Sequence, residues 1–192
     1  MWGVVTAVIP GSGIVDRRPA GHDRSMEMRA EVVINARAED AWLVVGDRFG
    51  QISEWASAIT ESSIDGRPGA GRVRTCVVRG FGPFGPGVIK ERLTRFDLDA
   101  RSLSYEAAEG MPGVIVHAVN RWSVTPGPGG GCTVKIHATL TLRPAARLLG
   151  PVLRRRMRAD TRRSLAELRH RVETGRPPPS KITASAGGTA RT

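Results

Sequence analysis

The feature that most restricts the fold is one long amphipathic segment that follows six consecutive strand-like segments. Residues 146–174 carry apolar side chains at every third or fourth position, which predicts a single long helix with one apolar stripe. Gly- and Pro-containing turns separate the segments before it, and no helical pattern lies between them. The strands should therefore pair antiparallel, since parallel pairs need long crossover connections. The predicted strands are 28–36, 58–64, 71–79, 87–96, 101–107, 113–124 and 132–142.

Residues 37–55 separate the first strand from the others and show helical spacing. Gly46 and Gly50 predict a break into two short helices. The fold class is therefore α+β, with a seven-stranded curved antiparallel sheet around a long C-terminal helix and two short helices after the first strand. One helix about 10 Å wide cannot fill a broad concave sheet, so we expect a pocket between the two layers.

The length of 192 residues corresponds to about one domain. We expect a folded domain over 26–175, a disordered N-terminal extension over 1–25 and a disordered tail over 176–192. The first apolar run lacks a basic segment and a cleavage motif, so neither a signal peptide nor a membrane anchor is expected and the predicted location is cytoplasmic. The candidate start sites are Met1, Met26 and Met28.

The formal charge of +11 is concentrated near the C-terminus. Residues 147–176 hold ten arginines against three acidic residues. Such a basic segment makes nucleic acid or an anionic membrane an open partner, but a solvated helix face is the favoured interpretation. The two cysteines, Cys76 and Cys132, lie in separate apolar runs and predict buried, reduced thiols. Because the histidines are dispersed as well, no metal and no cofactor is expected.

Four stretches of the chain carry a family resemblance: "AEDAWLVVGDRFGQISEW", "GAGRVRTCVVRG", "VIKERLTRFDLDARSLSY" and "RADTRRSLAELRHRVE". Together with the order of elements, they resemble the START-like (SRPBCC) superfamily with the helix-grip fold, in its polyketide cyclase/dehydrase and lipid transport branch. The resemblance covers residues 28–174. It implies an internal cavity for a small hydrophobic, polyketide- or lipid-like ligand, with two loops that cover the cavity mouth.

Strand alternation singles out Glu91 as a candidate site residue. In 87–96, alternation places Ile89, Glu91 and Leu93 on one face and Lys90 on the other. A carboxylate among apolar neighbours either binds a ligand, acts as a general acid or base, or serves as a hydrogen-bonded structural group. The resemblance implies that an acid at this position points inward.

Tyr105 and His117 complete the candidate catalytic set. The resemblance places Tyr105 inward, where its hydroxyl needs a partner, although simple packing is the commoner role of a buried tyrosine. His117 lies between Ile115 and Val119 and is either a hydrogen-bonded core residue or an acid/base group. For His137, the alternation predicts a solvent-facing side chain whereas the resemblance allows an inward one. The candidate catalytic residues are Glu91, Tyr105 and His117.

The candidate ligand-binding residues come from the third, fourth and sixth strands and from the two covering loops, "RGFGPFGPG" (79–87) and "EGMPGV" (109–114). The resemblance places Cys76 and Val78 in the pocket, and alternation gives Arg74 the same direction. Arg74 then pairs with Glu91 or with an acidic ligand group, or else forms a surface ion pair. The candidate ligand-binding residues are Arg74, Cys76, Val78, Phe81, Phe84, Ile89, Met111 and Ile115.

The glycine-rich stretch "RGFGPFGPG", residues 79–87, raises the question of a phosphate loop. A strand rather than a helix follows it and it lacks the G-x-x-x-x-G-K-[ST] pattern, which excludes nucleotide binding of that kind. It is either a plain hairpin turn or a lid in which Phe81 and Phe84 close over an apolar guest. With a lid, Phe84→Ala should speed ligand release without unfolding the domain.

Two classes of function remain open from the sequence. The first is a binder of a small hydrophobic ligand, which the resemblance extends to polyketide cyclase or dehydratase activity. The second is a toxin-like or regulatory protein that acts through the Arg-rich helix on a partner, a membrane or nucleic acid. Salt dependence separates them, because phosphate contacts weaken steeply with salt and an apolar pocket does not.

Overall fold

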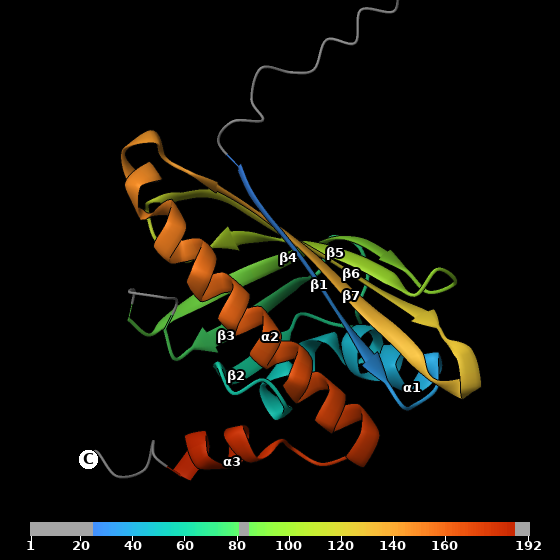
Figure 1. Ribbon diagram of the computed structural model, residues 1–192. Helices are drawn as coiled ribbons and strands as arrows, with labels where there is room; N and C mark the ends of the chain where they lie inside the picture. The colour runs from blue at the N-terminus through green and yellow to red at the C-terminus, as the bar shows by residue number, and fades with distance from the viewer. Residues whose placement is uncertain (1–24, 81–84, 187–192) are drawn as a thin grey trace, which may run out of the picture.

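A computed structural model describes residues 25–80 and 85–186, which form a single antiparallel sheet with helices on its concave side (Figure 1). The strand order is β1-β7-β6-β5-β4-β3-β2, so every pair of neighbours except β1 and β7 is also consecutive in the chain. The strands are β1 (Ser25–Ile34), β2 (Ile59–Ile64), β3 (Val73–Val78), β4 (Gly87–Asp97), β5 (Ser102–Glu109), β6 (Ile115–Pro126) and β7 (Cys132–Leu142).

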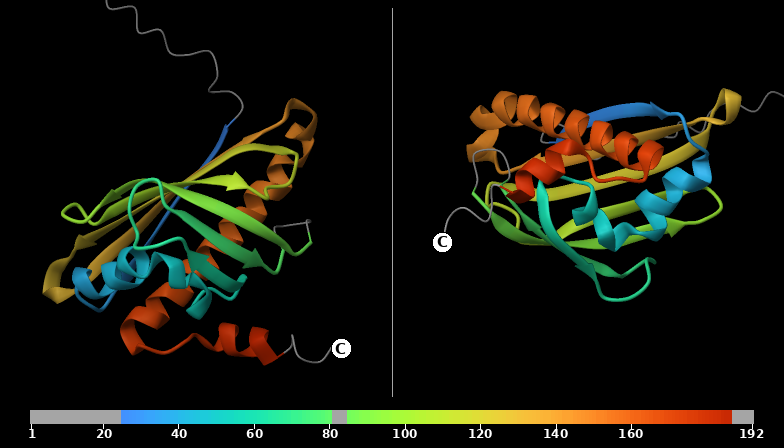
Figure 2. Two further views of the ribbon diagram at one scale, coloured as in Figure 1. Left: turned by 180° about the vertical axis from the view of Figure 1, so that it is seen from behind. Right: turned by 90° about the horizontal axis from the view of Figure 1, so that it is seen from below.

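The sheet curves around one long helix, α2 (Gly150–Thr174), which crosses its concave face (Figure 2). This arrangement is the helix-grip fold and confirms the predicted fold class. Its strand boundaries agree with the prediction within a few residues because the alternation along most strands is regular. In β7, for example, every second residue from Cys132 to Leu142 is buried.

The segment between β1 and β2 is helical but broken, as predicted from Gly46 and Gly50. It consists of α1 (Ala38–Trp42), one π-helical turn (Leu43–Asp47) and a 3-10 helix, η3 (Phe49–Glu54). A Cβ atom at Gly46 would lie 2.4 Å from the Trp42 ring, and one at Gly50 would lie 2.7 Å from Ile64. Only glycine therefore allows the backbone at these positions to lie so close to Trp42 and Ile64.

Strand β6 departs from simple alternation near its start. Its register with β7 shifts between Ile115 and His117, so that one additional residue, Val116, enters the strand. Ile115 and Ala118 are both buried, whereas Val116 and His117 are both exposed. This bulge reverses the direction of every side chain that follows it in the strand.

The C-terminal region differs from the prediction in two ways. The predicted helix 146–174 begins as α2 only at Gly150 and is preceded by a 3-10 helix, η5 (Pro144–Leu149). Gly175, at φ +69°, ends α2, and the region predicted to be a disordered tail forms a further helix, α3 (Pro179–Ala186). Among the described helices, none is both long and apolar enough to cross a membrane.

Candidate functional site

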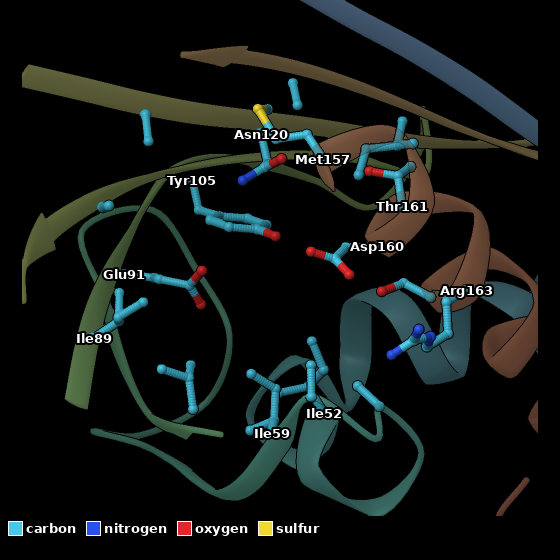
Figure 3. Close-up of a pocket in the computed structure, with 18 of the residues that line it drawn as sticks. Ile52, Ile59, Ile89, Glu91, Tyr105, Asn120, Met157, Asp160, Thr161 and Arg163 are labelled. Atoms are coloured by element: carbon cyan, nitrogen blue, oxygen red, sulfur yellow. The ribbon is translucent and has the colours of Figure 1, made fainter. Parts of the chain in front are cut away.

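A cavity of about 880 Å³ lies between the concave face of the sheet and α2 (Figure 3). The apolar core consists of two clusters of buried side chains, one around Trp42 and Trp122 and one around Leu140 and Leu153. Residues of both clusters line the cavity. The cavity therefore lies between the two clusters of the core. Its wall is mainly apolar. Apolar lining residues include Met28, Ile52, Ile59, Ile89, Ala118, Ile136, Ala138 and Met157.

The main polar feature of the cavity wall is an ion pair between Arg74 on β3 and Glu91 on β4. The register places these residues opposite each other. Both Nε and Nη2 of Arg74 donate to Oε2 of Glu91, at 2.8 and 2.5 Å. The Arg74 side chain is 3% exposed and that of Glu91 is 17% exposed. Arg74 is thus enclosed, while Glu91 reaches the cavity surface and points into it (Figure 3).

The guanidinium group of Arg74 is held on several sides. Its Nη1 donates to the backbone carbonyl oxygen of Phe49 at 2.8 Å, and its Cζ lies 3.6 Å from the centre of the Phe49 ring and 5.1 Å from that of Tyr105. Burial lowers the pKa of Arg74, but Glu91, Tyr105 and Cys76 together raise it by more, so the net pKa is raised. The structure therefore fixes a permanent positive charge directly behind Glu91.

Oxygen Oε2 of Glu91 receives the donors of Arg74 and a weak contact from Sγ of Cys76 at 3.6 Å. Among the described residues, none donates a hydrogen bond to the other carboxylate oxygen, Oε1. A ligand that carries a hydroxyl or amine group can donate to this oxygen. Burial raises the pKa of the Cys76 thiol to about 12, so Cys76 is a neutral packing group.

Tyr105 and Asn120 lie beside Glu91 and extend the polar area over β5 and β6 (Figure 3). Burial and then the charge of Glu91 raise the pKa of the Tyr105 hydroxyl, although Arg74 and Trp122 lower it in part. The hydroxyl is therefore protonated at neutral pH and can donate to a ligand oxygen. Glu91 offers an acceptor and Tyr105 a donor on the same wall.

A second polar group, formed by Asp160 and Arg163 on α2, faces the first across the cavity (Figure 3), and Arg156 of the same helix also lines the cavity. Nε of Arg156 donates to Oδ2 of Asp160 at 3.2 Å. The sequence analysis did not select these residues. One signal was present, because Asp160 is the only acidic residue in 143–166 and lies one position from Thr161 in the apolar stripe.

Helix α3 forms part of the cavity wall through Ser180 and Thr183. Glu167 on α2 is 5% exposed and links α3 to the segment before β2, since it accepts from Ser180 Oγ at 2.6 Å and from the Ser57 backbone N–H at 2.9 Å. Nζ of Lys181 donates to the backbone oxygen of Ile59 at 2.5 Å. These buried contacts explain why the C-terminal segment is ordered despite its polar composition.

Of the predicted site residues, the structure places six at the cavity wall and three elsewhere. Cys76 lies behind Glu91, and Ile115 belongs to the second core cluster rather than to the wall. The prediction that His117 faces inward is wrong, because the bulge in β6 turns its side chain to the outer face. His137 also faces outward, with Nε2 3.3 Å from Oε2 of Glu27. Phe81 and Phe84 lie outside the described residues, and the residues at the wall are Arg74, Val78, Ile89, Glu91, Tyr105 and Met111.

The described residues contain no group of three or more His, Cys, Asp or Glu side chains that could hold a metal ion. The cavity offers ionic and hydrogen-bonding groups on two opposite sides and apolar surface between them. Such a site can bind a mainly apolar molecule and orient its polar substituents.

Comparison with known proteins agrees with the fold. Residues 25–173 match the family described as polyketide cyclase/dehydrase and lipid transport, and the chain belongs to this family. No match to a curated protein sequence was found.

Three solved structures illustrate the similarity of fold. The TTHA0849 protein from Thermus thermophilus has 21% sequence identity and a TM-score of 0.64, and the alignment covers 77% of this chain and 97% of that one. The Zhui aromatase/cyclase from Streptomyces sp. R1128 has 18% identity and a TM-score of 0.61, with 80% and 99% coverage. A START superfamily protein from Mycobacterium smegmatis has 18% identity and a TM-score of 0.62, with 77% and 97% coverage.

Proposed function

We propose that this protein binds a small, mainly apolar molecule of polyketide or lipid type in the cavity between the sheet and α2. The observation that carries the proposal is the placement of the Arg74–Glu91 pair at the wall of a mainly apolar cavity of about 880 Å³. Such a volume lies within the range of small-molecule sites in proteins. Membership of the polyketide cyclase/dehydrase and lipid transport family supports the same class of ligand.

The polar groups of the wall define how the ligand lies. A hydroxyl group of the ligand donates to Oε1 of Glu91, and a carbonyl group accepts from the hydroxyl of Tyr105. The far end of the ligand reaches Asp160 and Arg163 on α2. The apolar part occupies the space between, where each buried methylene contributes about 0.8 kcal/mol.

A titration with an apolar fluorescent probe tests this proposal. Ala138 is 5% exposed and lines the cavity, so Ala138→Phe places a phenyl ring in the space of the ligand. The probe should bind wild type with a 1:1 stoichiometry and bind this variant at least tenfold more weakly. Val33 is 66% exposed, so Val33→Phe adds the same ring at the protein surface and should leave binding unchanged. Equal binding by all three proteins would refute the cavity as the ligand site.

Catalysis of cyclisation and dehydration is a second candidate, favoured by the presence of Asp160 opposite Glu91 and Tyr105. In such a reaction a carboxylate removes a proton next to a ketone, and the enolate forms a C–C bond to a second ketone carbon of the same molecule, whose oxygen becomes a hydroxyl group. The protonated tyrosine then assists the loss of this hydroxyl as water. The cavity brings these groups around one bound molecule. Incubation with a linear poly-β-ketone and detection of a product lighter by one water tests this activity, and Asp160→Asn and Tyr105→Phe should each abolish it.

A further inference from the structure

The start of α2 carries a group of exposed apolar side chains that the cavity does not use. Leu148 is 92% exposed, Val152 is 64% exposed and Leu149 is 44% exposed. All three lie within five positions, where η5 leads into α2 at one corner of the molecule (Figure 1). Single exposed leucines are common on protein surfaces, but a contiguous group marks an interaction site.

Positive charge borders this apolar group. Arg154, Arg155 and Arg158 are exposed on the first turns of α2. Within residues 25–80 and 85–186, none of these three arginines has a carboxylate at ion-pair distance. The one acidic side chain of this part of α2, Asp160, is engaged by Arg156 at the cavity. The surface therefore combines exposed aliphatic side chains with uncompensated arginines.

The combination of exposed aliphatic side chains and arginines favours one of two negatively charged partners, an anionic membrane or nucleic acid. Nucleic acid offers phosphates to the arginines but no apolar environment for Leu148 and Val152. An anionic membrane offers both, because arginines contact lipid phosphates while aliphatic side chains enter the boundary between headgroups and acyl chains. We propose that Leu148, Leu149, Val152, Arg154, Arg155 and Arg158 form a docking surface for anionic membranes, hereafter the α2 docking surface.

The α2 docking surface lies on the same helix turns that line the cavity. Met157 and Asp160, on the adjacent face of the same helix turns, line the cavity wall. Docking therefore brings that wall close to the bilayer, where apolar small molecules concentrate. The contact is peripheral, since it inserts side chains from one helix end and leaves the sheet outside the membrane. It does not depend on the proposed ligand, because vesicle binding is measured with the protein alone.

Vesicle flotation with the full-length protein tests the proposal. Vesicles of phosphatidylcholine with about 30% phosphatidylserine should carry the protein upward, and vesicles of phosphatidylcholine alone should not. Binding should fall steeply between about 50 and 300 mM salt because screening weakens the arginine contacts. Arg155→Glu with Arg158→Glu should weaken binding at least tenfold, and Leu148→Ser with Val152→Ser should weaken it severalfold at constant charge.

Matched variants distinguish an effect of the α2 docking surface on vesicle binding from an effect of the overall positive charge of the protein. Arg67 and Arg121 are exposed, lie far from α2 in sequence and form no ion pair among the described residues, so Arg67→Glu with Arg121→Glu makes the same change in net charge. Leu98 is 60% exposed in the turn between β4 and β5, and Leu98→Ser controls for lost apolar surface. Both controls should float like wild type.

Three results would overturn the proposal. The first is equal loss of flotation in the charge control and in the α2 variant. The second is binding to a short RNA duplex that the α2 variant loses while vesicles never bind. The third is a dimer in sedimentation analysis that Leu148→Ser with Val152→Ser converts to monomer, because a second copy would then cover the surface. A normal probe titration in the cavity would leave the proposed function intact in each case.

Discussion

Removal of one partner of the Arg74–Glu91 pair should cost more stability than removal of both. In Glu91→Leu, the Arg74 side chain, which is 3% exposed, loses its carboxylate partner. Its remaining partners are the backbone carbonyl group of Phe49 and the rings of Phe49 and Tyr105. Loss of one member of a buried ion pair costs about 3–5 kcal/mol. Because Glu91 is 17% exposed and borders the cavity, Arg74→Met leaves a carboxylate that water can reach, and we expect a smaller loss of about 2 kcal/mol.

The double variant Arg74→Met with Glu91→Leu removes both charges and should lie within about 1 kcal/mol of wild type, since apolar replacement of a whole buried pair is often neutral. The coupling energy of the pair should then be at least about 4 kcal/mol. Urea unfolding, followed by the fluorescence of the buried Trp42, Trp55 and Trp122, measures all four proteins.

The exposed pair between Lys135 and Glu31 provides the control, because it joins two strands of the same sheet with side chains 57% and 62% exposed. Lys135→Met with Glu31→Leu should show a coupling below about 1 kcal/mol. If the Arg74 and Glu91 substitutions were additive, or if Arg74→Met cost more than Glu91→Leu, the assignment of Arg74 as the enclosed partner would be refuted.

Three further predictions concern the cavity wall and its supports. Deletion of residues 177–192 removes α3 from the wall and should speed release of an apolar probe severalfold in stopped flow, and unchanged release would show that α3 does not close the cavity. Burial raises the pKa of Cys76 from 9.0 to about 12. The contribution of the neutral Cys76 thiol to the stability of the fold is therefore complete below pH about 9 and is lost as pH rises toward 12. Iodoacetamide should accordingly label Cys76 at pH 9 far more slowly in the folded than in the urea-unfolded protein, and equal rates would contradict its burial. Gly110 has φ +83°, and a Cβ atom there would lie 1.9 Å from the carbonyl oxygen of Val88. Gly110→Ala should therefore lower the free energy of unfolding by about 2–4 kcal/mol, whereas Gly113→Ala, which has open space around it, should lower it by less than about 1 kcal/mol.

The fold was predictable because its signals are local. Alternation identifies strands such as β7 residue by residue, and the single amphipathic segment identifies α2. Alternation also indicated Glu91, because Ile89, Glu91 and Leu93 share a face ahead of the register shift between Leu93 and Arg95. The same rule failed for His117 because a bulge two residues into β6 reverses the alternation, and one inserted residue leaves no composition signal.

Other parts of the site depend on contacts between distant segments. Helix α3 has a polar, Pro- and Ser-containing sequence, and its order derives from Glu167 and from the backbone oxygen of Ile59, more than 100 residues away from Lys181. The burial of Arg74 likewise depends on Phe49, which packs on it from η3. Local pattern carries no information about such contacts.

The central claim is that the cavity holds an apolar ligand. Native mass spectrometry of the protein, purified from the organism in which it naturally occurs, tests this claim most directly. Wild type should retain one small molecule that organic solvent extracts. Ala138→Phe, expressed and purified in the same way, should appear at the mass of the polypeptide alone, and Val33→Phe should retain the molecule. A bare polypeptide mass for wild type and both variants, or an equal amount of guest on Ala138→Phe, would contradict the account.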